Sequence, residues 1–183
     1  MSETKKNSLF DIKAILDKIA IDGRQNVAEL GCGNFGFFVW PLAKAVGKDG
    51  LVYAVDILKS ALEEVRRQAS RENFPQVKTV WSNLEIFKAT KIESNSLDAA
   101  LLINILNQSE KRGAMLREAV RMLKRGACLL VVEWKAGDLP FGPNPEKRVK
   151  IESLKLAIPK VGLDIKEEFE AGPFHYGLVL TKL

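Results

Sequence analysis

The sequence predicts an α/β domain built around a mostly parallel β-sheet. Short apolar runs alternate with segments whose apolar residues recur at helical spacing, which is typical of strands joined by crossover helices. One run, Leu97–Ile103, is apolar at nearly every position, as in a strand buried on both faces. With 183 residues, 46% of them hydrophobic, the chain is long enough for one substantial core, so we expect residues 1–183 to form a single domain.

Apolar runs bounded by Gly, Asn, Asp or Pro mark the expected strands. These are residues 27–30, 51–55, 77–81, 97–103, 127–134, 163–169 and 176–180. The last two are joined by the short connection Ala171-Gly172-Pro173-Phe174, which has no room for a crossover helix. We therefore expect this final pair to be an antiparallel hairpin.

Apolar residues spaced three and four apart predict the helices. The first runs from Leu9 to Ile19, before the first strand, and the next ends near Val46. Another contains Leu58, Ala61, Leu62 and Val65, and one more runs from Met115 to Leu123. A short last helix is stopped or kinked by Pro159. The polar residues 1–7 are expected to be disordered. Residues 135–148 contain several prolines and form either a lid over the crevice or a rigid connector.

Composition excludes several classes of protein. The run Ala127 to Val132 is far too short to cross a bilayer, and no N-terminal signal is visible, so we expect a cytoplasmic protein with no membrane partner. Cys32 and Cys128 are too few for a disulfide framework or a metal cluster, and no metal site is predicted. The net charge of 28 − 23 = +5 is a mild excess, which favours lysines on solvated helix faces over a nucleic-acid patch.

The strongest local pattern is Glu29-Leu30-Gly31-Cys32-Gly33-Asn34-Phe35-Gly36. Glycines directly after a strand and before a helix allow a tight turn and the close approach of a nucleotide. Asp56 follows Gly36 by 20 residues, at the end of the second strand, where a carboxylate can accept hydrogen bonds from ribose hydroxyls. Glu29 would repel a pyrophosphate, but it suits a ligand that carries an ammonium group.

These residues resemble the class I S-adenosylmethionine-dependent methyltransferases. Glu29 to Gly33 resembles the acidic-x-Gly-x-Gly motif of that family, and Ser82-Asn83-Leu84-Glu85 resembles its adenine-binding segment. Arg121 to Ala127 resembles the turn before its fifth strand. The resemblance covers about residues 8 to 183. It implies a Rossmann-like, doubly wound, seven-stranded sheet of order 3-2-1-4-5-7-6, with S-adenosyl-L-methionine as the cofactor.

The resemblance also implies the residues of the cofactor site, because ligands of such sheets lie beyond the carboxyl ends of the strands. Ile57 and Leu84 would sandwich the adenine, unless both are ordinary core residues. Asn83 stands where an Asp is usual, and Phe35 stands where a third glycine is common. The implied cofactor-binding residues are Glu29, Gly31, Cys32, Gly33, Gly36, Asp56, Ile57, Asn83, Leu84 and Asn104.

The candidate catalytic residues are Asn104, Trp134 and His175, which also lie at strand ends on the same edge. His175 is the only histidine and could act as a general base, or be bonded within the hairpin. Trp134 could stack on a substrate or pack at the rim.

The methyl acceptor is not readable from the sequence. The general similarity is to quinone-biosynthesis methyltransferases, which favours a small-molecule substrate, although a nucleic acid or protein is not excluded. Residues Asn104-Ile105-Leu106-Asn107 lack the Pro-Pro-aromatic motif of adenine methylation. Two alternatives stay open: an NAD(P)-binding oxidoreductase, or a cofactor-binding module without catalysis. The oligomeric state is not predicted.

Overall fold

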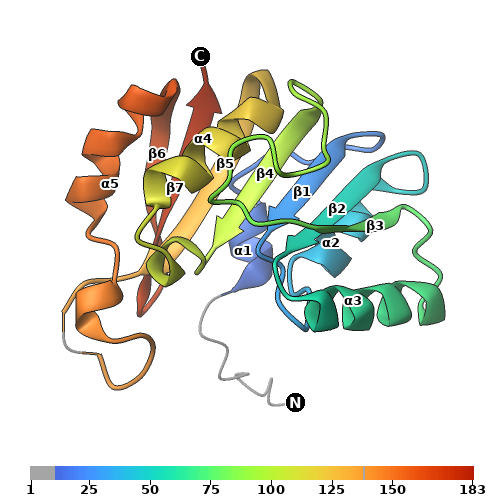
Figure 1. Ribbon diagram of the computed structural model, residues 1–183, viewed down its shortest axis with the longest axis horizontal. Helices are drawn as coiled ribbons and strands as arrows, with labels where there is room; N and C mark the ends of the chain where they lie inside the picture. The colour runs from blue at the N-terminus through green and yellow to red at the C-terminus, as the bar shows by residue number, and fades with distance from the viewer. Residues whose placement is uncertain (1–10, 138) are drawn as a thin grey trace, which may run out of the picture.

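A computed structural model describes residues 11–137 and 139–183 of the chain (Figure 1). It contains a seven-stranded sheet of order β3-β2-β1-β4-β5-β7-β6, which confirms the expected order. Residues 1–7, which were expected to be disordered, lie outside the described residues. So does Leu9, the expected start of the first helix.

The strands follow the apolar runs closely. β1 to β5 run parallel, while β7 is antiparallel to both β5 and β6, so the predicted terminal hairpin is confirmed. In Figure 1 the arrowheads of β1, β2 and β4 point to one edge of the sheet. The strands are β1 (Asn26–Leu30), β2 (Leu51–Asp56), β3 (Val77–Trp81), β4 (Leu97–Ile103), β5 (Leu123–Trp134), β6 (Leu163–Gly172) and β7 (His175–Lys182).

Helices cover both faces of the sheet, which confirms the doubly wound arrangement. Buried residues of α1 (Ile12–Leu16), α2 (Val39–Val46) and α3 (Lys59–Arg71) join one core cluster. Those of α4 (Arg112–Met122) and α5 (Ile151–Ala157) join the cluster on the other face. In α2 the buried positions Val39, Leu42, Ala43 and Val46 follow one helical stripe, which is why this segment packs as a helix.

The connection between β3 and β4, residues 82–96, contains no helix. Leu84 and Ile92 pack from it into the core beside α4. The fully buried carboxylate of Glu118 accepts hydrogen bonds from the backbone amides of Lys88 and Thr90, so a side chain supplies bonds that a helix would otherwise provide. The crossover is therefore an ordered loop.

The start of β5 differs most from its expected position, whereas α5 stops before Pro159 as expected. β5 begins at Leu123, four residues before the predicted start, and its register on β4 shifts between Leu97 and Ala99. Gly126 takes a φ of 78° there, a conformation that glycine adopts without strain. α5 ends at Ala157, just before Pro159, which begins the 3-10 turn η3 (Pro159–Val161).

None of the helices in the described part of the chain is long and apolar enough to pass through a bilayer.

Candidate functional site

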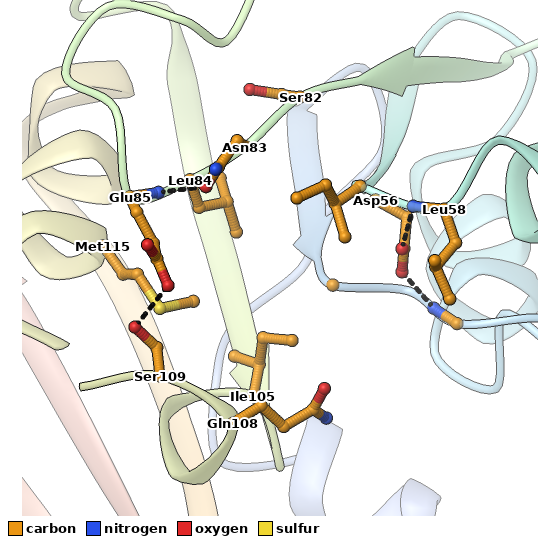
Figure 2. A pocket seen from close by; sticks show the side chains of 13 residues that line it. Asp56, Leu58, Ser82, Asn83, Leu84, Glu85, Ile105, Gln108, Ser109 and Met115 are labelled. Atoms are coloured by element: carbon orange, nitrogen blue, oxygen red, sulfur yellow. Dashed lines mark hydrogen bonds between the residues drawn. The ribbon is translucent and has the colours of Figure 1, made fainter. Parts of the chain in front are cut away.

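A cavity of about 300 Å³ lies beyond the carboxyl ends of β1 to β4 (Figure 2). Figure 2 shows Asp56 and Leu58 on one side, Ser82 to Glu85 along a second, and Ile105, Gln108, Ser109 and Met115 closing the rest. The lining is completed by Gly31, Gly33 and Ile57.

Six of the residues expected to bind the cofactor line this cavity: Gly31, Gly33, Asp56, Ile57, Asn83 and Leu84. Four others do not: Glu29, Cys32, Gly36 and Asn104. Glu29 and Cys32 are buried beneath the glycine turn. Gly36, with a φ of 52°, faces Val39 and Val65 instead of the cavity.

The glycine turn brings the backbone close to the opposite wall. Gly31 has a φ of 89°, and a Cβ placed there would lie 2.7 Å from Ile105 Cδ1. Gly33 has a φ of 61° with open space where a Cβ would stand. Gly31 is thus required by both its backbone conformation and its packing against Ile105, whereas Gly33 leaves room beside the cavity.

Asp56 holds the turn in place. Its Oδ2 accepts a hydrogen bond from Gly33 N at 2.9 Å and its Oδ1 accepts one from Leu58 N at 2.8 Å. The side chain is only 8% exposed. Asp56 is therefore a structural acceptor as well as a cavity residue.

Glu29 is buried beside the start of α2. Burial raises its pKa to about 8, an effect that the nearby backbone amides of Val39 and Phe38 oppose. Its Oε2 is buried and has no hydrogen-bond partner among residues 11–137 and 139–183. Glu29 was expected to face the crevice, but in this structure it is 4% exposed and does not line the cavity.

Beyond β3, polar groups bind one another around the cavity. Asn83 Oδ1 accepts a hydrogen bond from Glu85 N at 2.9 Å, and Ser109 Oγ donates to Glu85 Oε1 at 2.6 Å (Figure 2). The bond between Glu85 and Ser109 connects the loops that follow β3 and β4. Of the two apolar residues expected to sandwich the adenine, Leu84 is 6% exposed and Ile57 is 53% exposed.

The sequence did not reveal the wall formed by Ile105, Gln108, Ser109 and Met115. These residues come from the 3-10 turn η1 (Leu106–Gln108), its flanks and α4. Their apolar and polar types are ordinary for a loop and a helix, and only the packing of α4 on the sheet turns them toward the cavity. The position of Ile105, two residues after the end of β4, was the one available signal.

His175 lies at the expected edge, paired with Trp134, but it is fully buried. Asn104 Nδ2 lies 3.1 Å from His175 Nε2, and the Trp134 and His175 rings are 4.1 Å apart. Burial, with the charge of Lys135, lowers the histidine pKa to about 4. Full burial of His175 and the 8% exposure of Trp134 favour structural roles for both rings over the expected base and stacking roles.

The described residues of loop 135–148 are held together by a buried arginine and an aromatic contact. The Arg148 guanidinium is buried and donates to the carbonyl oxygens of Pro143, Gly137 and Phe141. Phe141 packs edge-on against Phe174 and Trp134. None of the described loop residues lines the cavity, and Phe141 packs instead near the end of β5 and the start of β7.

Neither cysteine is placed for nucleophilic work. Burial raises the thiol pKa of Cys32 above its ordinary range and that of Cys128 to about 11. Among the described residues, no three His, Cys, Asp or Glu side chains are grouped so that they could hold a metal ion.

A family model described as a methyltransferase domain matches residues 21–169. The chain belongs to this family of methyltransferase domains. The resemblance to class I S-adenosylmethionine-dependent methyltransferases is thereby confirmed, and an oxidoreductase is disfavoured. The solved structure of a SAM-dependent methyltransferase from Aquifex aeolicus superimposes with a TM-score of 0.87, covering 96% of this chain and 91% of that one. At 22% identity, this likeness shows the shared fold alone.

Two relatives match this methyltransferase domain in sequence. A 2-phytyl-1,4-naphtoquinone methyltransferase from Nostoc punctiforme is 27% identical over 142 residues, which are 77% of this chain and 59% of the relative. An S-adenosyl-L-methionine-dependent Diels-Alderase from Talaromyces variabilis is 27% identical over 166 residues, 88% of this chain and 53% of the relative. The chain therefore spans little more than half the length of these relatives.

We expect Asp56→Ala to lower the free energy of unfolding by about 1–3 kcal/mol, because two backbone amides lose a buried acceptor. Asp56→Asn, which keeps one acceptor oxygen, should lose less. Urea denaturation measures both. Unfolding curves of Asp56→Ala that overlay those of the wild type would contradict this role.

Glu29 should make the protein less stable as the pH rises. The folded protein keeps the Glu29 proton up to about pH 8, whereas the unfolded chain releases it near 4.5. Between these values the folded state binds the extra proton, so the free energy of unfolding falls with pH by up to about 1.4 kcal/mol per unit.

Glu29→Gln should remove this fall, which is best measured between pH 6.5 and 8. The pKa of His175 is lowered from 6.5 to about 4, so this residue raises the free energy of unfolding as the pH rises from 4 to 6.5. Above pH 6.5 it adds no further pH dependence. Parallel stability profiles of the wild type and Glu29→Gln over this window would contradict the assignment.

Proposed function

We propose that this domain binds S-adenosyl-L-methionine in the cavity and transfers its methyl group to a small-molecule acceptor. The observation that carries the proposal is the charge of the site. Among the described residues, the charged side chains lining the cavity are Asp56 and Glu85, both acidic, and no Lys or Arg lines it. Glu85 is paired with Lys111 at 3.7 Å, so Asp56 is the main source of negative charge, which favours a sulfonium over a phosphate.

The start of α2 supports the same choice of ligand. In dinucleotide-binding folds, the helix after the glycine turn offers its free backbone amides to the pyrophosphate. Here the buried Glu29 side chain lies close to the amides of Phe38 and Val39 at the start of α2. A pyrophosphate at this helix start would adjoin a buried acid, whereas a nucleoside without phosphate would not.

The lining residues fit an adenosyl group. Each Asp56 oxygen accepts one backbone bond and keeps a further lone-pair site for a ribose hydroxyl. Ile57 and Leu84 offer apolar faces for a purine, and Asn83 adds an amide beside them. The volume of about 300 Å³ lies within the range of small-molecule sites.

When bound, S-adenosylmethionine supplies a methyl group already activated by its positive sulfur. The domain then has to orient the acceptor in line and exclude water. With His175 buried and largely neutral, an acceptor that is nucleophilic without a strong protein base is favoured. The naphtoquinone methyltransferase relative supports a small organic acceptor of this kind.

Calorimetry tests the cofactor. We expect S-adenosylmethionine and S-adenosylhomocysteine to bind with micromolar Kd values, which correspond to about 8 kcal/mol, and NADH and NADPH not to compete. Asp56→Ala should raise the Kd by about 10- to 100-fold, because it loses hydrogen bonds to a charged group. Asp98→Ala is the matched control, since that carboxylate accepts from Asn26 N outside the cavity. Absence of binding to the wild type would overturn the proposal.

Transfer is tested with S-adenosylmethionine labelled in its methyl group and fractionated small molecules, RNA and protein. Label in a small-molecule fraction supports the proposal. Label confined to RNA or protein would overturn the small-molecule acceptor. Binding without transfer to any fraction would favour the non-catalytic cofactor-binding module.

A further inference from the structure

Glu133, near the end of β5, is a fully buried acid that the site described so far does not use. Its Oε1 accepts hydrogen bonds from Leu106 N at 2.6 Å and Asn107 N at 3.3 Å, and its Oε2 accepts from Asn107 Nδ2 at 2.9 Å. Both carboxylate oxygens are therefore directed at the turn η1.

The same turn is held from a second side. Arg112, the first residue of α4, donates from Nε to Leu106 O at 3.1 Å and from a guanidinium nitrogen to Lys147 O at 3.2 Å. Side chains thus satisfy both the amide and the carbonyl of Leu106. A 3-10 turn this short has little stability of its own, so its position depends on these bonds.

η1 and its flanks form one wall of the cavity. Ile105, Gln108 and Ser109 line it, and Ile105 packs against Gly31 so closely that a Cβ on Gly31 would lie 2.7 Å from it. At this point the η1 wall and the glycine turn touch, and any shift of η1 changes the width of the cavity.

We propose that Glu133 is a positioning residue for the cofactor: it fixes η1 against the glycine turn without touching the ligand. This inference rests on the proposed function, because it assumes that the cofactor occupies this cavity.

Three donors converge on Glu133, and a carboxylate is the side chain that can accept from all of them. Burial raises the pKa of Glu133, whereas the bonds from Asn107 and η1 lower it. Glutamine keeps one oxygen for the two backbone amides, and its NH₂ can donate to Asn107 if that amide turns over. Alanine leaves all three donors without this acceptor. Glu133→Gln therefore removes the charge and keeps hydrogen bonds, whereas Glu133→Ala removes both.

The experiment compares the Kd for S-adenosylmethionine by calorimetry in the wild type, Glu133→Ala and Glu133→Gln. We expect Glu133→Ala to raise the Kd by about tenfold or more, because the wall moves. Glu133→Gln should restore it to within about threefold of the wild type. Equal Kd values in the wild type and Glu133→Ala would overturn the inference.

Leu180→Ala is the control for general destabilisation. Leu180 is fully buried in β7, paired with Leu129 and Ile165, and takes no part in the cavity. We expect it to lower the melting temperature without changing the Kd at a temperature where all variants are folded. A Kd raised as much in Leu180→Ala as in Glu133→Ala would assign the effect to stability and overturn the positioning role.

Should Glu133→Ala fail to fold, Asn107→Ala replaces it, because it removes only the bond from Asn107 Nδ2. The Kd should then rise by about threefold, and an unchanged Kd would overturn the inference. Wild-type protein that binds no cofactor would overturn the proposed function and this inference together. Wild-type binding with no response of the variants would overturn the inference alone.

Discussion

Buried carboxylates that accept backbone hydrogen bonds hold the functional edge of this domain together. Asp56 accepts from Gly33 and Leu58, and Glu133 accepts from Leu106 and Asn107. Loops at the ends of parallel strands have amides that no neighbouring strand can pair, and each such amide is costly to bury without a partner. A carboxylate accepts several of them at once, and it positions the loop as it does so.

These acids also set the chemistry of the site. Because carboxylates stabilise the loops, negative charge gathers around the cavity, and lysine and arginine are absent from its described lining. Under the proposed function, the interactions that hold the cavity walls are also the ones that favour a cationic nucleoside.

The sequence predicted the sheet well because strand burial depends on short-range patterns. Leu97–Ile103 is apolar because β4 is covered on both faces, and the short connection after Ala171 leaves the antiparallel hairpin as the way to join the last two strands. Residues close to the glycines were also found, since turn geometry requires glycine at Gly31. Prediction was poorer where the partner is distant in sequence. His175 and Trp134 were placed at the correct edge, but their burial depends on loop 135–148, whose packing no local pattern reveals.

The amino-acid sequence by itself determined the order of the elements, the glycine turn and the acid at the end of β2, because each depends on neighbours within a few residues. Tertiary structure alone decided which side chains face the cavity. It buried Glu29 and His175, and it brought Ser109 and Met115 in from the loop after β4 and from α4. The physical reason is that side-chain exposure is fixed by how elements pack on one another, and residues far apart in the chain make those contacts.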